Sequence, residues 1–112
     1  MGLDNFWKLP KGVDEPTFEP ELHLVGGMFS EHGSGSFRGK CYDSIVYGIT
    51  GVTLYSQEII APVVADMAAK LEKATLKEAQ KFNPEISLEE FADLQRMFTE
   101  YAKLGAILQG WW

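Results

Sequence analysis

The stretch ISLEEFADLQRMFTEYAKLGAILQGWW, Ile86 to Trp112, carries the most regular hydrophobic pattern in the chain. Ser87 is a good N-cap residue and Glu90 completes a capping box, so a helix is expected to begin at the next residue after the cap. Apolar residues then recur at steps of three and four, which places them on one side of an amphipathic helix. The pattern predicts one continuous helix from Leu88 to Leu108, with Gly110 as the left-handed residue that ends it. The apolar stripe consists of Phe91, Leu94, Phe98, Tyr101, Leu104 and Leu108.

The length of this predicted helix favours self-association. It would measure about 30 Å, close to the diameter of roughly 34 Å of a compact chain of this size. The stripe is apolar to its end and two tryptophans follow it, so it either closes the core of its own chain or continues onto a partner. Burial in the core is the stronger interpretation for Phe91 to Leu104, and the two interpretations are balanced for the tryptophans. The interface predicted for a dimer consists of Met97, Tyr101, Leu104, Leu108, Trp111 and Trp112.

Composition is typical of a small globular domain. The 112 residues are 46% hydrophobic and carry a formal charge of −6. That charge opposes binding to nucleic acid or to an anionic membrane, because both need clustered Lys and Arg. No apolar run approaches the roughly 18 residues of a spanning helix, and no signal peptide is visible. We therefore expect a cytoplasmic protein. Its one cysteine excludes an internal disulfide.

The N-terminal half is expected to contain an arm and a hairpin. Prolines among residues 1–20 predict an extended arm that packs on the body, which leaves residues 21–112 as a single domain. Glu21 to Ser30 has strand composition, residues 31–36 read as a turn, and Phe37 to Tyr42 would return as a second strand. These three segments together predict an antiparallel β-hairpin.

A short helix is expected next, although a second hairpin competes with it. Asp43 is a plausible N-cap for a helix from Ser44 to Thr50, and Gly51 would end it. The same residues are mostly β-branched, so they also fit a hairpin that turns at Gly51. The cap and the stop favour the helix, and Val52 to Tyr55 would follow it as a connecting or edge strand.

A second long helix precedes the C-terminal one. Pro62 suits the first turn of a helix, and Asn83-Pro84 would end it. The helical spacing of apolar residues in this segment is interrupted at Leu76, which a kink or a second contact surface would explain. The short link to Ser87 predicts an antiparallel helical pair. The expected fold is therefore α+β: a small antiparallel hairpin or sheet, one short helix, and two long helices packed on one face.

Candidate catalytic and metal-binding groups are few. The segment from Gly33 to Cys41 superficially resembles a phosphate-binding loop, but the glycine spacing and the cysteine in place of Ser or Thr do not fit. Cys41 could act as a thiolate with His32 or His23 as its base, yet Asp43 nearby would raise the thiol pKa. His23, His32, Glu21 and Glu31 match no metal-site spacing. We expect no metal and no cofactor.

One cluster is still expected to bind a ligand or a partner. Tyrosine and arginine are favoured at interfaces, and both occur densely between residues 32 and 55. The sequence thus predicts a non-enzymatic interaction or regulatory module that self-associates. The alternative is a small-molecule-binding domain with its pocket between sheet and helices, and an enzyme using Cys41 and His32 is a third. The predicted binding residues are His32, Arg38, Lys40, Tyr42, Tyr47 and Tyr55.

Overall fold

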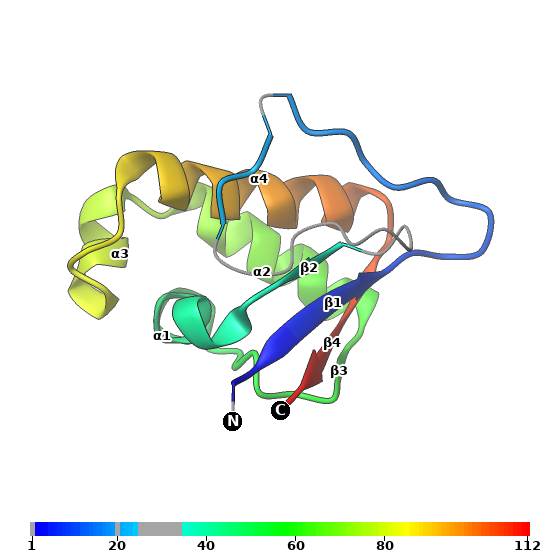
Figure 1. The fold of residues 1–112 in the computed structure, drawn as a ribbon, viewed down its shortest axis with the longest axis horizontal. Helices are drawn as coiled ribbons and strands as arrows, with labels where there is room; N and C mark the ends of the chain where they lie inside the picture. Colours follow the sequence, from blue (N-terminus) through cyan, green and yellow to red (C-terminus); the bar gives the residue numbers. More distant parts are fainter. Residues whose placement is uncertain (1, 20, 25–34) are drawn as a thin grey trace.

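A computed structural model describes residues 2–19, 21–24 and 35–112. Within these residues an antiparallel four-stranded sheet is packed against four helices, which confirms the predicted α+β class (Figure 1). None of the helices in this described part of the chain has the length and apolar character needed to cross a bilayer. The elements in chain order are β1 (Asp4–Lys8), β2 (Ser36–Phe37), α1 (Gly39–Thr50), β3 (Glu58–Ile59), α2 (Ala61–Lys73), α3 (Leu76–Phe82), α4 (Leu88–Lys103) and β4 (Ile107–Trp111).

The two ends of the chain form the centre of the sheet. The strand order is β2-β1-β4-β3, and each neighbouring pair is antiparallel. The register of β1 against β4 runs from Asp4 opposite Trp111 to Lys8 opposite Ile107. Figure 1 shows both termini at the same end of the sheet, with the helices gathered on one side of it.

The C-terminal helix begins as predicted but ends earlier. The Ser87 hydroxyl accepts a hydrogen bond from the Glu90 N–H at 3.0 Å, as an N-cap should. Gly105, and not Gly110, adopts the left-handed conformation, with φ 75°. Because the chain turns there, α4 stops at Lys103 and Ile107–Trp111 becomes a strand. The prediction of a continuous helix to Leu108 is therefore wrong.

The N-terminal segment is also more regular than expected. Asp4–Lys8 lies within the predicted irregular arm, but it forms β1 with alternating exposed and buried side chains. The prolines come after this strand, in residues 9–19, where no helix or strand is assigned. Buried Trp7 and the ladder with β4 fix the strand, and neither is visible to a local pattern.

The predicted hairpin differs from the structure on its returning side. Ser36 and Phe37 form the short strand β2, which pairs with β1. The next residues are helical, because α1 starts at Gly39. The predicted strand from Phe37 to Tyr42 is thus wrong beyond its first residue. Of the other predicted strand, residues 21–24 have no regular structure, and residues 25–30 lie outside the described part.

Helix α1 confirms the helical alternative for Ser44 to Thr50, with a different start. Gly51 ends it with φ 78°, as predicted. Asp43 lies inside the helix and is not its cap. Its carboxylate instead accepts hydrogen bonds from the Leu54 N–H at 2.7 Å and the Thr53 hydroxyl at 3.0 Å. This side chain therefore holds the connection to β3, where no strand forms over residues 52–55.

The second predicted helix is divided into α2 and α3. Pro62 lies in the first turn of α2, as expected. Thr75 then caps α3 through a capping box with Glu78, and this new start explains the interruption of the helical spacing at Leu76. Gln95 of α4 donates hydrogen bonds to the carbonyls of Leu71 at 2.8 Å and Ala74 at 3.2 Å. These bonds satisfy backbone carbonyl groups at the C-terminal end of α2 and connect that end to α4.

The core between sheet and helices is closely filled. The Trp7 ring stacks on Tyr101 with 4.6 Å between centroids and meets the edge of Phe98 at 5.0 Å. Asn5 is fully buried beside Trp7, and its amide nitrogen donates to the Leu54 carbonyl at 3.2 Å. Aromatic stacking of this kind contributes about 0.5–1.5 kcal/mol beyond area burial.

We predict that Gly39→Ala destabilises the protein, although alanine is the better helix former by about 1 kcal/mol. A Cβ at Gly39 would lie 1.7 Å from the side-chain oxygen of Asn5 and 2.9 Å from a Leu3 methyl group. Overpacking of this kind costs about 1–3 kcal/mol. Urea unfolding measures the loss.

Lys40→Ala is the matched control, because Lys40 is the exposed neighbour in the same helix. It should change the free energy of unfolding by less than about 0.5 kcal/mol. An increase in stability for Gly39→Ala would contradict the close approach of Asn5 to the start of α1.

Candidate functional site

The predicted binding residues that the structure describes do not gather around one pocket. The buried hydroxyl group of Tyr42 donates a hydrogen bond to Glu90 at 2.5 Å, so it links α1 to α4. Arg38 precedes α1, and its guanidinium lies 4.0 Å from the carboxylate of Asp4. These two members of the set thus serve different contacts within the chain.

The other members of the predicted set lie on the surface or outside the described residues. Lys40 and Tyr47 are exposed on α1. Tyr55 follows α1 and meets the ring of Trp112 edge-on, with 5.7 Å between centroids. His32 lies outside the described residues. Its expected pairing with half-buried Cys41 therefore stays a prediction.

The residues predicted for a dimer interface divide into two groups. Met97, Tyr101 and Leu108 are at most 1% exposed, so they belong to the core of the chain. Leu104 is half-buried. Trp111 is 75% exposed and Trp112 is 48% exposed. The tryptophans are therefore exposed in this chain, and they lie at the end of strand β4 and not on a helix.

One side of the sheet faces away from the helices. Along β1 the buried residues are Asn5 and Trp7, and Trp7 contacts α4. Asp4, Phe6 and Lys8 alternate with them and point to the opposite side. Their register partners on β4 share that side. Glu58 of β3 is the register partner of Gln109, so it shares this side as well. We call this surface the open sheet face; it consists of Asp4, Phe6, Lys8, Glu58, Ile107, Gln109 and Trp111.

An aromatic patch covers one end of the open sheet face. A hollow of about 280 Å³ is bordered by Phe6, Trp111 and Trp112, among others. A second hollow of about 410 Å³ lies along Phe6 and Trp111 and reaches Lys8 and Gln109. Tyr55 extends the patch through its contact with Trp112. The aromatic patch therefore comprises Phe6, Tyr55, Trp111 and Trp112, and it contains large apolar groups at the surface.

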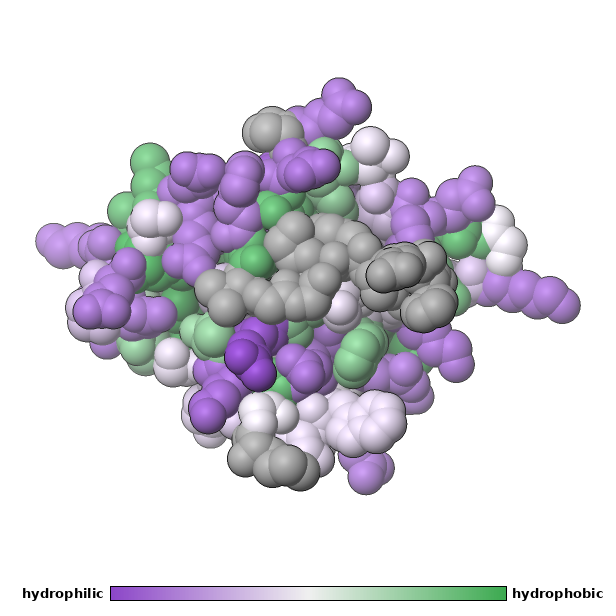
Figure 2. All heavy atoms as spheres, viewed as in Figure 1, coloured by the Kyte–Doolittle hydropathy of each residue, from purple (hydrophilic) through white to green (hydrophobic). Residues whose placement is uncertain are grey.

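The rest of the visible surface is more ordinary. On the face that Figure 2 shows, hydrophilic side chains cover most of the described surface, and hydrophobic atoms appear in small areas between them. Scattered exposed apolar groups are normal in globular proteins. Four neighbouring aromatic side chains are less common than such scattered groups.

A hollow of about 430 Å³ between α1, α2 and α3 is lined by Lys70, Lys73 and Lys81 together with Glu78. The ammonium group of Lys70 already lies 3.0 Å from Asp66. Lys70 and Lys73 also occupy the last turn of α2, where the helix dipole favours positive charge. Stabilisation of α2 is therefore a sufficient reason for two of the three lysines to occur at this hollow.

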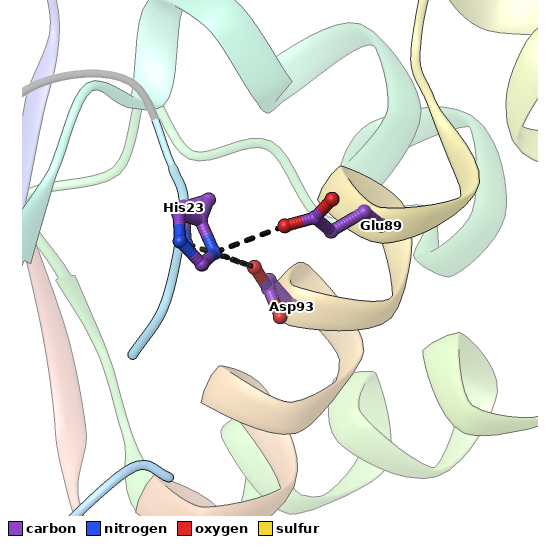
Figure 3. Close-up of side chains that lie close together, drawn as sticks. All are labelled: His23, Glu89 and Asp93. Atoms are coloured by element: carbon purple, nitrogen blue, oxygen red, sulfur yellow. Dashed lines mark hydrogen bonds and ion pairs between the residues drawn. The ribbon is translucent and has the colours of Figure 1, made fainter. Parts of the chain in front are cut away.

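A histidine and two carboxylates meet at the first turns of α4. Residues 21–24 run beside this helix with Leu22 and Leu24 buried, so His23 between them points outward. Its Nδ1 lies 3.2 Å from Glu89 and 3.4 Å from Asp93 (Figure 3). One donor atom from each of the three residues lies within 4.8 Å of the other two.

Asp93 is the most constrained member of this cluster. It is 5% exposed and accepts hydrogen bonds from Arg96 and from the backbone N–H of His23, both at 2.8 Å. Burial acts to raise the pKa of Asp93, but these hydrogen bonds and the charge of Arg96 outweigh it and lower the pKa below 3.8. The carboxylate is therefore held ionised and in a fixed orientation.

Sequence reasoning missed this cluster because its members are far apart in the chain. His23 and Asp93 are separated by 70 positions. The available signal was the spacing of Glu89 and Asp93, which puts two acids on one side of the predicted helix. Nothing local indicates that His23 crosses that helix.

We predict that Asp93→Asn lowers the free energy of unfolding by about 1–3 kcal/mol at pH 7, because it weakens a buried, charged hydrogen-bond network. Because the folded-state pKa is lowered, this stabilisation is present above the ordinary value of 3.8. It is lost as the pH falls through the folded-state pKa. Urea unfolding at several pH values measures both effects.

Glu89→Gln is the control for Asp93→Asn, because the Glu89 side chain is 71% exposed. It should change the stability by less than about 0.5 kcal/mol. Equal effects of the two substitutions would contradict the special role of Asp93.

Comparison of the chain with known protein families, with curated proteins and with solved structures finds no match.

Proposed function

We propose that this chain is a non-enzymatic interaction module that pairs with a second copy of itself through the open sheet face. The observation that carries the proposal is the aromatic patch, in which Trp111 is 75% exposed. Tryptophan and tyrosine are enriched in the residues that dominate binding energy at interfaces. A cytoplasmic location is part of the proposal and is consistent with the single cysteine.

The exposed aromatic area is large enough to form the centre of an interface. A large aromatic side chain offers about 150–250 Å². Tyr55, Trp111 and Trp112 are 41%, 75% and 48% exposed, respectively. Together they offer about 350 Å², whereas one partner in a standard interface contributes about 800 Å². The remainder of the open sheet face would supply the rest.

The order of side chains on β1 fits a second copy better than an unrelated partner. The β1 side chains on the open sheet face are, in order along the strand, acidic Asp4, aromatic Phe6 and basic Lys8. A two-fold axis that crosses the strands at Phe6 would place two such rows antiparallel, face to face. Asp4 would then oppose Lys8 of the partner subunit, and the opposite pair would form by symmetry.

The β4 side chains on the open sheet face are compatible with the same two-fold axis. Gln109 is the register partner of Phe6, so the axis would also cross β4 at Gln109. Trp111 would then oppose Ile107 of the partner subunit. An apolar pair and a charged pair would form on each side of the axis, as a symmetric dimer requires. Glu58, the register partner of Gln109 on the edge strand β3, would face its own copy across the axis. Two sheets packed face to face lie about 10 Å apart, within reach of these side chains.

Charge reversal tests this pairing. Asp4→Lys and Lys8→Asp each place like charges opposite each other in the dimer, so each should weaken dimerisation about tenfold or more. The double variant restores opposite charges and should recover most of the affinity. Sedimentation equilibrium over micromolar concentrations measures the dimerisation constant, and circular dichroism checks that each variant is folded.

Two further variants complete the design. Trp111→Ala should weaken the dimer about tenfold or more, because it removes an exposed anchor. Tyr47→Ala is the control, because Tyr47 is 57% exposed on α1, which is not part of the open sheet face. A wild-type chain that stays monomeric at 100 micromolar, or a double variant no better than the single ones, would refute the proposal.

A further inference from the structure

We propose that His23, Glu89 and Asp93 form a binding site for a divalent transition-metal ion, with Zn²⁺ as the best match. The site is separate from the open sheet face and does not depend on dimerisation. It would fasten residues 21–24 to the first turns of α4.

The donor atoms suit this class of ion. Zinc is bound in proteins by imidazole nitrogens and carboxylate oxygens, and a site with three protein ligands keeps a water molecule in the fourth position. Imidazole favours transition metals over Mg²⁺ and Ca²⁺, which prefer oxygen ligands alone. The His23 and Glu89 side chains are 60% and 71% exposed, so an ion and a water molecule can reach the site.

The spacing of the donor atoms agrees with zinc coordination. With metal–ligand distances of about 2.1 Å, two ligand atoms of a tetrahedral site lie about 3.4 Å apart. The Nδ1 of His23 lies 3.2 Å from the Glu89 oxygen and 3.4 Å from the Asp93 oxygen. The third separation is no more than 4.8 Å. A small rotation of the exposed Glu89 side chain would bring all three atoms to coordination distance.

The helix places its two carboxylates as helical metal motifs do. Glu89 and Asp93 are four residues apart, so they project from successive turns toward the same side (Figure 3). Two like charges at this spacing repel each other in an isolated helix. A cation between them removes the repulsion, and His23 supplies the third donor from a different segment.

The surroundings of Asp93 resemble the outer shell of a metal site. Arg96 binds one carboxylate oxygen at 2.8 Å, while the oxygen nearer to His23 accepts the backbone N–H of His23. Partners of this kind orient a ligating carboxylate before the metal arrives. With Arg96 counted, the two carboxylates retain one net negative charge for the ion.

Calorimetric titration with Zn²⁺ at pH 7.5 tests the site. The wild-type chain should bind one ion with a saturable isotherm, and a chelator should reverse the binding. His23→Ala and Glu89→Gln should each weaken binding by about tenfold or more, the usual effect of losing a ligand or its support. The exposed Glu89 can be changed without loss of the fold, so the test does not depend on the stability of an Asp93 variant.

Two controls separate this site from adventitious binding. Glu85→Gln removes an exposed acid just before α4 and should leave the affinity within about twofold. His32→Ala removes the other histidine and should do the same. Resonances of the His23 ring should shift on addition of Zn²⁺, and those of the His32 ring should not. The proposal is overturned if zinc produces no saturable binding, or if binding persists in His23→Ala and is lost in His32→Ala.

Discussion

The pairing of β1 with β4 is the constraint on which the rest of the structure depends. It joins the first residues of the chain to the last ones in a five-pair ladder, from Asp4 opposite Trp111 to Lys8 opposite Ile107. The outer strands are attached through this pair, because β2 hydrogen-bonds to β1 and β3 hydrogen-bonds to β4. The same pairing buries Trp7 against α4 and places Asn5 between the strands and the start of α1. A contact between distant parts of the chain is entropically costly to form, so the burial of these side chains has to offset that cost.

The central ladder also determines which side chains remain on the surface. Alternation along each strand sends Trp7 and Leu108 into the core, and it sends Phe6 and Trp111 to the other side. Because the strands are antiparallel neighbours, aromatic residues from both ends of the chain meet in one patch. The patch is thus a direct consequence of the register. A shift by one residue would exchange the buried and exposed sets, so stability of the core and composition of the open sheet face are linked.

Local signals in the sequence identified much of the helical structure and little of the sheet. The cap at Ser87, the stop at Gly51 and the proline in the first turn of α2 each act within a few residues, and all three were predicted. The error at the C-terminus arose because Leu104 and Leu108 continue the helical spacing, while Leu108 also fits the alternation of a strand. Only the partner strand decides between these periods, and that partner is β1, at the opposite end of the sequence. Cys41 and Tyr42 were assigned to a strand for a similar reason, since nothing local shows that β2 ends after two residues. The candidate metal site is still less visible in the sequence, because His23 meets α4 through tertiary packing.

The acids at the start of α4 do not by themselves make a metal site. They differ in how their negative charges are stabilised, and this difference explains the position of His23. Glu89 and Glu90 lie in the first turn, where the positive end of the helix dipole stabilises negative charge without any ligand. Asp93 lies one turn further along and is 5% exposed, so it gains less from the dipole and loses its contact with water. Its charge is tolerated because Arg96 and the backbone of His23 bind it. The backbone bond fixes the position of residue 23, and the imidazole is then brought to both carboxylates. The cluster therefore owes its geometry to the one buried carboxylate, and the exposed groups around it complete a set of donors that a metal ion can use.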